Sequence, residues 1–171
     1  ETIGAVIASV IAPPDISEVI VVDDGSTDDT ARRATLAGAT VIALPQNGGK
    51  GNAMNRGVLV AKENVILFLD ADVIGMSHQD ISRIIDPVLS GTYAMFVGLR
   101  SRKILVLNKL LRYFPIIGGD RALVKQLWQS VPERYRDNFK VEIALNFFSK
   151  QTALGMGFTH IDGITHRIKE Q

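Results

Sequence analysis

The feature that most constrains this chain is an apolar run, Val65–Leu69, that ends on two carboxylates, Asp70 and Asp72. Five consecutive apolar residues predict a strand buried on both faces, as in a parallel sheet. In extended backbone Asp70 and Asp72 point to the same side, where two acids repel unless a positive group lies between them. A divalent cation that binds carboxylates and substrate phosphates would meet that need. The alternative is a polar turn that merely ends the strand.

The rest of the first half alternates between strand and helix patterns. We expect a helix over 2–10, a second buried strand over 16–22, a helix from an acidic capping box at 26–29 to about 37, a strand over 40–44, and a helix capped by Asn52. Such alternation predicts βαβ units and an α/β fold, with a mostly parallel sheet flanked by helices. The length of 171 residues suits a single domain.

The second half has a different pattern. Ser77 and Asp80 predict the start of a helix that ends near Leu89, because they form a capping box. We expect further elements at 93–98 (strand), 104–113 (amphipathic helix), 120–128 (helix capped by Asp120), 141–154 (helix) and 155–165 (strand).

Charge and cysteine content exclude several classes of protein. The formal net charge is only +1, which argues against a nucleic-acid partner. The sequence has no cysteine, so it forms no disulfides or thiolate metal sites and suits a reducing compartment. Neither a membrane-spanning run nor a signal peptide is visible, and we expect a cytoplasmic location.

Three polar features follow the ends of predicted strands. They are Asp23-Asp24, the loop 47–51 with Lys50, and the acids at 70 and 72. Ligands of such sheets bind at the carboxyl ends of the strands, so we expect these features to form one site. Loop 47–51 allows close approach of an anion, but it lacks the hydroxyl residue that follows the lysine of a P-loop. A plain flexible loop, and a turn at Gly25, are the alternatives.

Two later residues are candidates for the same site. His166 could complete a metal site with Asp72, since imidazole is a common ligand, or it could be structural. Glu142 could act as a base or bind an acceptor hydroxyl, or it could be an acid favoured at a helix N-terminus.

Three blocks, Val21–Asp28, Asn47–Gly51 and Phe68–Asp72, resemble family 2 glycosyltransferases of the GT-A fold. The resemblance implies a nucleoside diphosphate sugar donor, with Asp23 or Asp24 at the base and Lys50 near the nucleotide. It also implies that Asp70-Ala71-Asp72 is a DxD motif for Mg²⁺ or Mn²⁺. Residues 1–75 would be the nucleotide-binding half, and residues 76–171 the acceptor-binding half.

The start of the sequence departs from the family pattern. Members of the family begin with an apolar strand and a turn that touches the nucleotide, and Glu1–Gly4 resembles the segment after that turn. The resemblance therefore implies that the first strand is missing from this sequence and that the sheet has a gap.

Short segments of the second half are similar to the glucosyl-3-phosphoglycerate synthase branch of these enzymes. This similarity implies that His166 joins the DxD motif on the metal, and that Gly98, Arg100 and Gly119 help to bind a phosphorylated acceptor. Polyprenyl-phosphate glycosyltransferases are the other related group. For them, the basic helix near 102–113 would suit a lipid phosphate and a peripheral contact with the inner face of a membrane.

The sequence thus predicts a metal-dependent glycosyltransferase in which Asp72 and Glu142 serve the chemistry. The donor is a nucleoside diphosphate sugar, and the acceptor is a small molecule or a lipid phosphate. Inversion or retention of the sugar configuration is left open, as is a homodimer. The competing interpretations are a sugar-nucleotide nucleotidyltransferase, a non-catalytic nucleotide-binding domain and a signalling domain with clustered acids.

Overall fold

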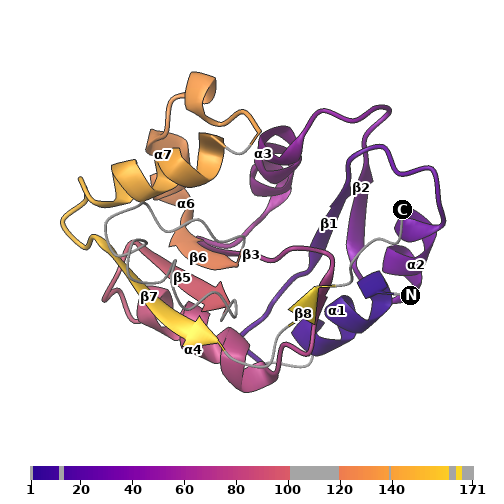
Figure 1. Ribbon diagram of the computed structural model, residues 1–171, viewed down its shortest axis with the longest axis horizontal. Coiled ribbons are helices and arrows are strands. Elements are labelled where there is room, and N and C mark those ends of the chain that lie inside the picture. Colours follow the sequence, from indigo (N-terminus) through magenta and orange to yellow (C-terminus); the bar gives the residue numbers. More distant parts are fainter. Residues whose placement is uncertain (1, 12–13, 101–119, 139, 162–164, 167–171) are drawn as a thin grey trace, which may run out of the picture.

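The computed structural model describes the chain except residues 1, 12–13, 101–119, 139, 162–164 and 167–171, and it also leaves out the side chains of residues 2, 74, 165 and 166 (Figure 1). The helices are α1 (Thr2–Ile11), α2 (Thr30–Leu36), α3 (Lys50–Val60), α4 (His78–Leu89), α6 (Lys125–Ser130), the 3₁₀ turn η1 (Glu133–Tyr135) and α7 (Lys140–Ser149). The strands are β1 (Ile20–Asp23), β2 (Thr40–Ala43), β3 (Val65–Phe68), β4 (Val73–Ile74), β5 (Met95–Arg100), β6 (Arg121–Val124), β7 (Met156–Ile161) and β8 (Thr165–His166).

The described strands form three separate sheets. β1 and β2 are parallel, β3-β6-β5-β7 form a mixed sheet, and β4 pairs antiparallel with β8. Parallel pairing, as predicted, holds for β1 with β2 and for β5 with β7, whereas β6 runs antiparallel to both of its neighbours. The α/β architecture is confirmed.

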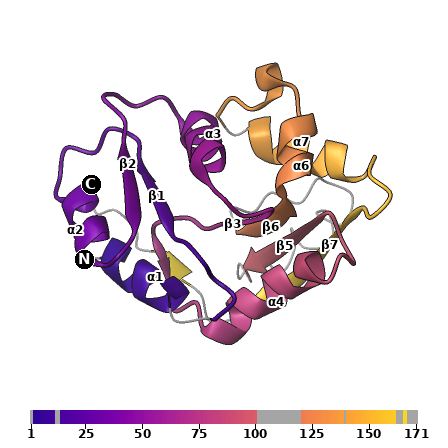
Figure 2. The ribbon, with the colours of Figure 1, turned by 180° about the vertical axis from the view of Figure 1, so that it is seen from behind.

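A large apolar cavity lies between the two main pieces of sheet. Its volume is about 680 Å³, and β1, β3, α1 and α3 all line it. Figure 2 shows β1 and β2 set apart from β3, so the expected gap in the sheet is present. The prediction that β1 and β3 are buried on both faces is wrong. Their apolar residues are only half-buried, because both strands line this cavity.

The main hydrophobic core lies where the four-stranded sheet meets α6 and α7. Met95, Leu123, Trp128 and Leu145 are nearly or fully buried there, and Phe68 stacks at a tilt on Trp128 with 5.4 Å between ring centroids. A second core packs α1 and α4 against the same sheet. These layers hold β3, β5 and β6 rigidly, and the residues at and just beyond their ends form the site.

Local signals placed some helix ends correctly. The capping box of Ser77 and Asp80 is present, with each residue binding the other's backbone N–H, and Gly38 follows α2 in the left-handed conformation. Two other predicted starts are wrong. α2 begins only at Thr30, because the Ser26 N–H donates to Asp23 instead, and Asn52 lies inside α3, which begins at Lys50.

The segment after Asp120 was predicted as the start of a helix and forms a strand first. Residues 121–124 pair with β3 on one side and with β5 on the other, and helix α6 begins only at Lys125. Pairing on both sides satisfies the backbone hydrogen bonds of this segment, so tertiary contacts override its helical pattern. The amphipathic helix predicted at 104–113 lies outside the described residues. None of the helices that are described is both long enough and apolar enough to cross a membrane.

Candidate active site

Asp24 joins the end of β1 to the glycine loop. Its two carboxylate oxygens accept hydrogen bonds from the Gly48 and Gly49 N–H groups, each at 2.8 Å. Gly49 has a φ of +84°, which suits glycine, and it immediately precedes α3. The acid and the loop therefore meet as predicted, but the carboxylate of Asp24 is already bound to the backbone.

The neighbouring acid, Asp23, is turned inward. Its side chain accepts a hydrogen bond from the Ser26 N–H at 2.9 Å, and the residue is only 7% exposed. This contact shapes the turn after β1. Both acids therefore have backbone partners, and these contacts shape the turn after β1 and the glycine loop.

Lys50 opens α3 and lies between two acids from distant parts of the chain. Its ammonium donates to Asp70 at 3.1 Å and to Glu142 at 2.7 Å. Asp70 comes shortly after β3, and Glu142 lies in the first turn of α7. Burial alone would lower the pKa of Lys50, but the hydrogen bond to Glu142 and the charges of both acids outweigh it and raise that pKa.

Arg100 holds Asp70 from the other side. It forms a two-pronged pair with Asp120, with both N···O distances at 2.6 Å, and its Nη2 also lies 3.3 Å from Asp70. Asp120 is fully buried. Burial opposes the charge of Arg100, but the hydrogen bonds to Asp120 and the charges of nearby acids raise its pKa. Arg100, predicted to bind the acceptor, is thus engaged in organising the site.

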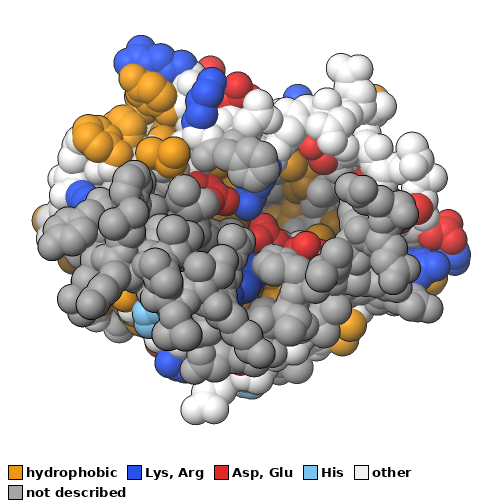
Figure 3. All heavy atoms as spheres, viewed as in Figure 1, with side chains coloured by type: hydrophobic (Ala, Val, Ile, Leu, Met, Phe, Trp, Pro, Cys, Tyr) orange, Lys and Arg blue, Asp and Glu red, His pale blue; other side chains and the backbone are white. Residues whose placement is uncertain are grey.

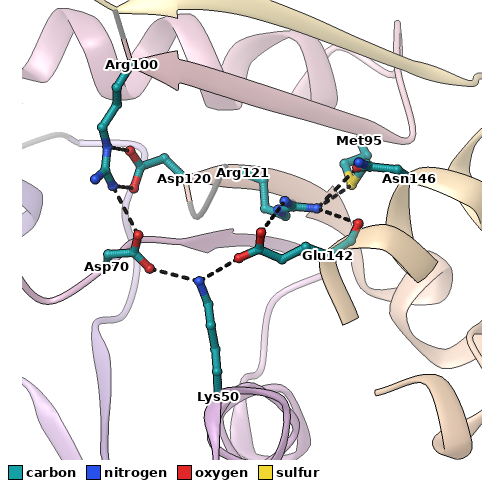
Figure 4. Close-up of polar contacts among 8 residues, drawn as sticks. All are labelled: Lys50, Asp70, Met95, Arg100, Asp120, Arg121, Glu142 and Asn146. Atoms are coloured by element: carbon teal, nitrogen blue, oxygen red, sulfur yellow. Dashed lines mark hydrogen bonds and ion pairs between the residues drawn. The ribbon is translucent and has the colours of Figure 1, made fainter. Parts of the chain in front are cut away.

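Sequence reasoning missed two members of this network. The segment 118–121 is similar to the synthase branch, but Asp120 is individually predicted only as a helix cap and Arg121 is given no role of its own. Arg121 is fully buried beneath Glu142, and desolvation lowers its pKa. The signal in the sequence was a pair of adjacent charges, Asp120-Arg121, ahead of the apolar residues 122–124. Figure 4 shows the resulting chain of alternating charge, from Arg121 through Glu142, Lys50, Asp70 and Arg100 to Asp120.

Asp72 is exposed, and its charge contributes to raising the pKa of Arg100. The backbone of β4 pairs with that of β8, and this pairing sets Val73 opposite His166. The backbone of residue 166 therefore lies beside the DxD segment, and a role for His166 on a metal stays a prediction. Among the side chains that are described, no three His, Asp or Glu residues gather into a metal site.

The predicted acceptor glycines have different outcomes. Gly98 is buried in β5, and a Cβ there would lie 2.7 Å from Ile84 Cδ1 and 2.8 Å from Ile161 Cδ1. Its small size therefore serves the packing of α4 and β7 on β5, which gives no support to a contact with the acceptor. Gly119 lies outside the described residues.

The charged residues border a hollow. In the space-filling view, acidic and basic side chains gather in a depression near the centre of the face (Figure 3). Lys50, Asp70 and Ala71 also line the apolar cavity between β1 and β3. An arrangement of fixed cations and carboxylates beside a partly apolar hollow can orient a charged ligand and stabilise charge that develops on it.

Comparison with known proteins agrees with this geometry. The profile of glycosyl transferase family 2 matches residues 1–156. Glucosyl-3-phosphoglycerate synthase of Mycobacterium tuberculosis is 31% identical over 130 residues, which cover 71% of this chain and 40% of that protein. The chain spans about 30–40% of the length of the first curated relatives that it matches.

Crystal structures of the M. tuberculosis synthase have the same fold. Its complex with Mn²⁺, uridine diphosphate and glucosyl-3-phosphoglycerate gives a TM-score of 0.81 at 26% identity, covering 99% of this chain and 68% of that chain. Its complex with Mg²⁺ and uridine diphosphate gives 0.82 at 25% identity, with the same coverage.

The fold and the acids beyond the strand ends define an α/β protein of the GT-A type. More particularly, the chain belongs to glycosyl transferase family 2.

Proposed function

We propose that this chain carries the donor-binding and metal-binding part of a glycosyltransferase that moves a hexose from a nucleoside diphosphate sugar to a phosphorylated small molecule. The observation that carries the proposal is the convergence of Lys50, Asp70 and Glu142 beside the end of β3, in a chain of family 2. The similar mycobacterial structures contain uridine diphosphate, a divalent metal and a phosphorylated product. Uridine diphosphate glucose is therefore the first donor to test.

The residues present suit a divalent cation. Asp72 is exposed beside β4, and the β4–β8 pairing brings residue 166 alongside it. A carboxylate, an imidazole and the oxygens of a diphosphate are suitable ligands for Mn²⁺ or Mg²⁺. Asp72 and His166 would hold the ion. Asp70 already pairs with the Lys50 ammonium and the Arg100 guanidinium, so it would contribute its negative charge to the surroundings of the ion. When bound, such a cation neutralises charge on the departing diphosphate.

The chain's own residues have separable roles. Asp24 fixes the glycine loop, and this loop places Lys50 at the start of α3, where its ammonium can meet a diphosphate. Arg100 and Asp120 keep Asp70 in place. Glu142 would orient the acceptor or take its proton, and its pairing with Lys50 favours orientation. The 1–75 and 76–171 halves would serve donor and acceptor, and the Lys50–Glu142 pair joins them.

A lipid-phosphate acceptor has less support. The lipid acceptor and the peripheral membrane contact are both predicted from the basic helix at 102–113, which lies outside the described residues. A small phosphorylated acceptor is the first to test, because the similar mycobacterial structure contains glucosyl-3-phosphoglycerate, and the proposal does not depend on a homodimer. The family match favours sugar transfer over nucleotidyl transfer, phosphosignalling or simple nucleotide binding.

Binding of nucleotides is the direct test. Isothermal titration of the chain with uridine, adenosine and guanosine diphosphates, with and without Mn²⁺, should show metal-dependent binding of at least one of them. A protein that contains these site residues should then transfer glucose from uridine diphosphate glucose to 3-phosphoglycerate. Lack of any metal-dependent binding by a folded chain would reject the proposed donor site.

A further inference from the structure

Arg121 is an unusual residue for its position. It begins β6, the strand that pairs with both β3 and β5, and its side chain has no exposed surface. Arginine is rarely buried completely unless it is paired, because removing its charge from water costs several kcal/mol. Pairing of β6 with its neighbours does not require a charged side chain at this position. The contacts of the guanidinium must therefore explain why an arginine is buried there.

Those partners lie on one face of α7. Nη1 of the guanidinium donates to the Glu142 carbonyl at 3.3 Å and to the Asn146 side-chain oxygen at 3.4 Å, and it lies 4.0 Å from the Met95 sulfur. Nη2 lies 3.8 Å from the Glu142 carboxylate. Glu142 and Asn146 are one helical turn apart, so Arg121 holds the first turns of α7 from beneath.

Glu142 lies between two cations that approach different oxygens. Lys50 meets Oε1 at 2.7 Å, and Arg121 lies 3.8 Å from Oε2 (Figure 4). The Glu142 side chain is only 4% exposed, so water does little to stabilise its charge. Lys50 is also shared with Asp70, so Arg121 supplies a second positive charge beside Glu142, and the charges of Asp70 and Asp120 act on Arg121 as well. A carboxylate buried in this way is costly if one of its partners is lost.

We propose that Arg121 is a positioning residue for the transfer site: it compensates the buried Glu142 carboxylate, holds it toward Lys50, and thereby fixes the Lys50 ammonium between Glu142 and Asp70. The inference rests on the proposed function for the role of Glu142 in transfer. The pairing itself can be tested without any substrate.

The first experiment is a double-mutant cycle of stability, followed by urea unfolding. Arg121→Met should lower the urea midpoint, because it leaves the Glu142 charge uncompensated. Glu142→Gln added to it should restore about half of that loss or more, because the uncompensated charge is gone. Arg121→Gln provides the same cycle if the Met variant does not fold, because it also removes the positive charge. A double variant no more stable than its arginine single variant overturns the proposal.

The second experiment separates positioning from mere stability. Trinitrobenzenesulfonate should modify Lys50 faster in Glu142→Gln and in Arg121→Met than in wild type. Peptide mass spectrometry measures the rate of this modification. The rate should not change in Ile81→Val, a core control on α4 in a different hydrophobic cluster from the one that contains α7. An unchanged rate in the Arg121 variant contradicts a role in fixing Lys50. This readout needs no sugar transfer, so it stands even if the proposed donor is wrong.

The third experiment uses turnover. If Arg121 acts through Glu142, kcat of the Arg121→Lys/Glu142→Gln variant should equal that of Glu142→Gln alone, while the KM for the donor changes little. If the two effects multiply instead, Arg121 acts independently of Glu142 and the proposal fails. Absence of transfer in the unmodified protein counts against the proposed function, whereas the first two experiments still decide the role of Arg121.

Discussion

The Lys50 ammonium and the Glu142 carboxylate lie 2.7 Å apart although 92 positions separate them in the sequence. This contact joins the helix that follows the glycine loop to the helix of the second half. Asp70, 20 positions from Lys50, completes the bridge at 3.1 Å. The candidate site is therefore built across the whole domain, and each member can be tested separately.

The Lys50 pairs should make stability depend on pH only in the alkaline range. The pKa of Lys50 is raised above its ordinary value of 10.5, so the folded state keeps the proton longer than the unfolded state. The contribution is complete below that value and is lost as the pH rises through the raised pKa. The difference in free energy of unfolding between wild type and Lys50→Met should hold steady from neutral pH and shrink in the strongly alkaline range.

Urea unfolding across that pH series measures the effect. Lys140→Met is the matched control, because this lysine is 69% exposed and lies 3.8 Å from Asp137. Its difference from wild type should stay small at every pH. A Lys50 difference that grows with alkaline pH would contradict the assigned direction.

Replacing Asp72 tests the metal site. Asp72→Ala should weaken Mn²⁺-dependent nucleotide binding by at least about tenfold, because it removes a carboxylate ligand. Titration calorimetry with uridine diphosphate and Mn²⁺ measures the change in binding, with Asp29→Ala, at the residue before α2, as an exposed acidic control. Sugar transfer by the Asp72 variant within about threefold of wild type would remove Asp72 from the metal role.

Removing the Asp24 carboxylate should loosen the glycine loop. Asp24→Ala loses two hydrogen bonds to backbone N–H groups and should cost about 1–3 kcal/mol of stability. Because the carboxylate binds the loop, affinity for all nucleoside diphosphates should fall together.

Binding of several nucleoside diphosphates to Asp24→Ala distinguishes the two roles. A selective change in the preference for one base would instead show direct recognition of the base. Asp28→Ala is the control, since Asp28 caps Thr30 on an exposed turn.

Position 51 should not tolerate a residue larger than glycine. A Cβ at Gly51 would overlap the Arg136 carbonyl oxygen, which is backbone and cannot easily move aside. Gly51→Ala should therefore destabilise the protein by about 1–3 kcal/mol and displace the start of α3 from the segment at 136–138. Gly4→Ala is the control, because Gly4 lies in α1 and nothing is within 4 Å of the added carbon.

Thermal unfolding of both glycine variants provides the measurement. Gly4→Ala should raise stability by up to about 1 kcal/mol through helix propensity. If Gly51→Ala is as stable as wild type, the close approach of α3 to the 136–138 segment does not restrict the size of the residue at position 51.

Much of the fold was predictable because its signals are local. The capping box at Ser77 and Asp80 needs only residues within one helical turn, and the structure confirms it. The strand after Asp120 was missed because pairing with β3 and β5, which no local pattern encodes, decided its conformation. Likewise, the apolar runs of β1 and β3 gave no sign that a cavity would leave them half-exposed.

The sequence by itself determined where polar residues follow apolar strand patterns, and so it singled out Asp24, Lys50, Asp70 and Asp72 as candidates for one site. Only the tertiary structure decided their partners: Asp24 binds backbone, Arg100 pairs with Asp120, and Arg121 lies buried beneath Glu142. The reason is physical. Strand and helix patterns depend on neighbours a few residues away. The energy of a charge depends on its distance to other charges and to water, and folding alone sets those distances.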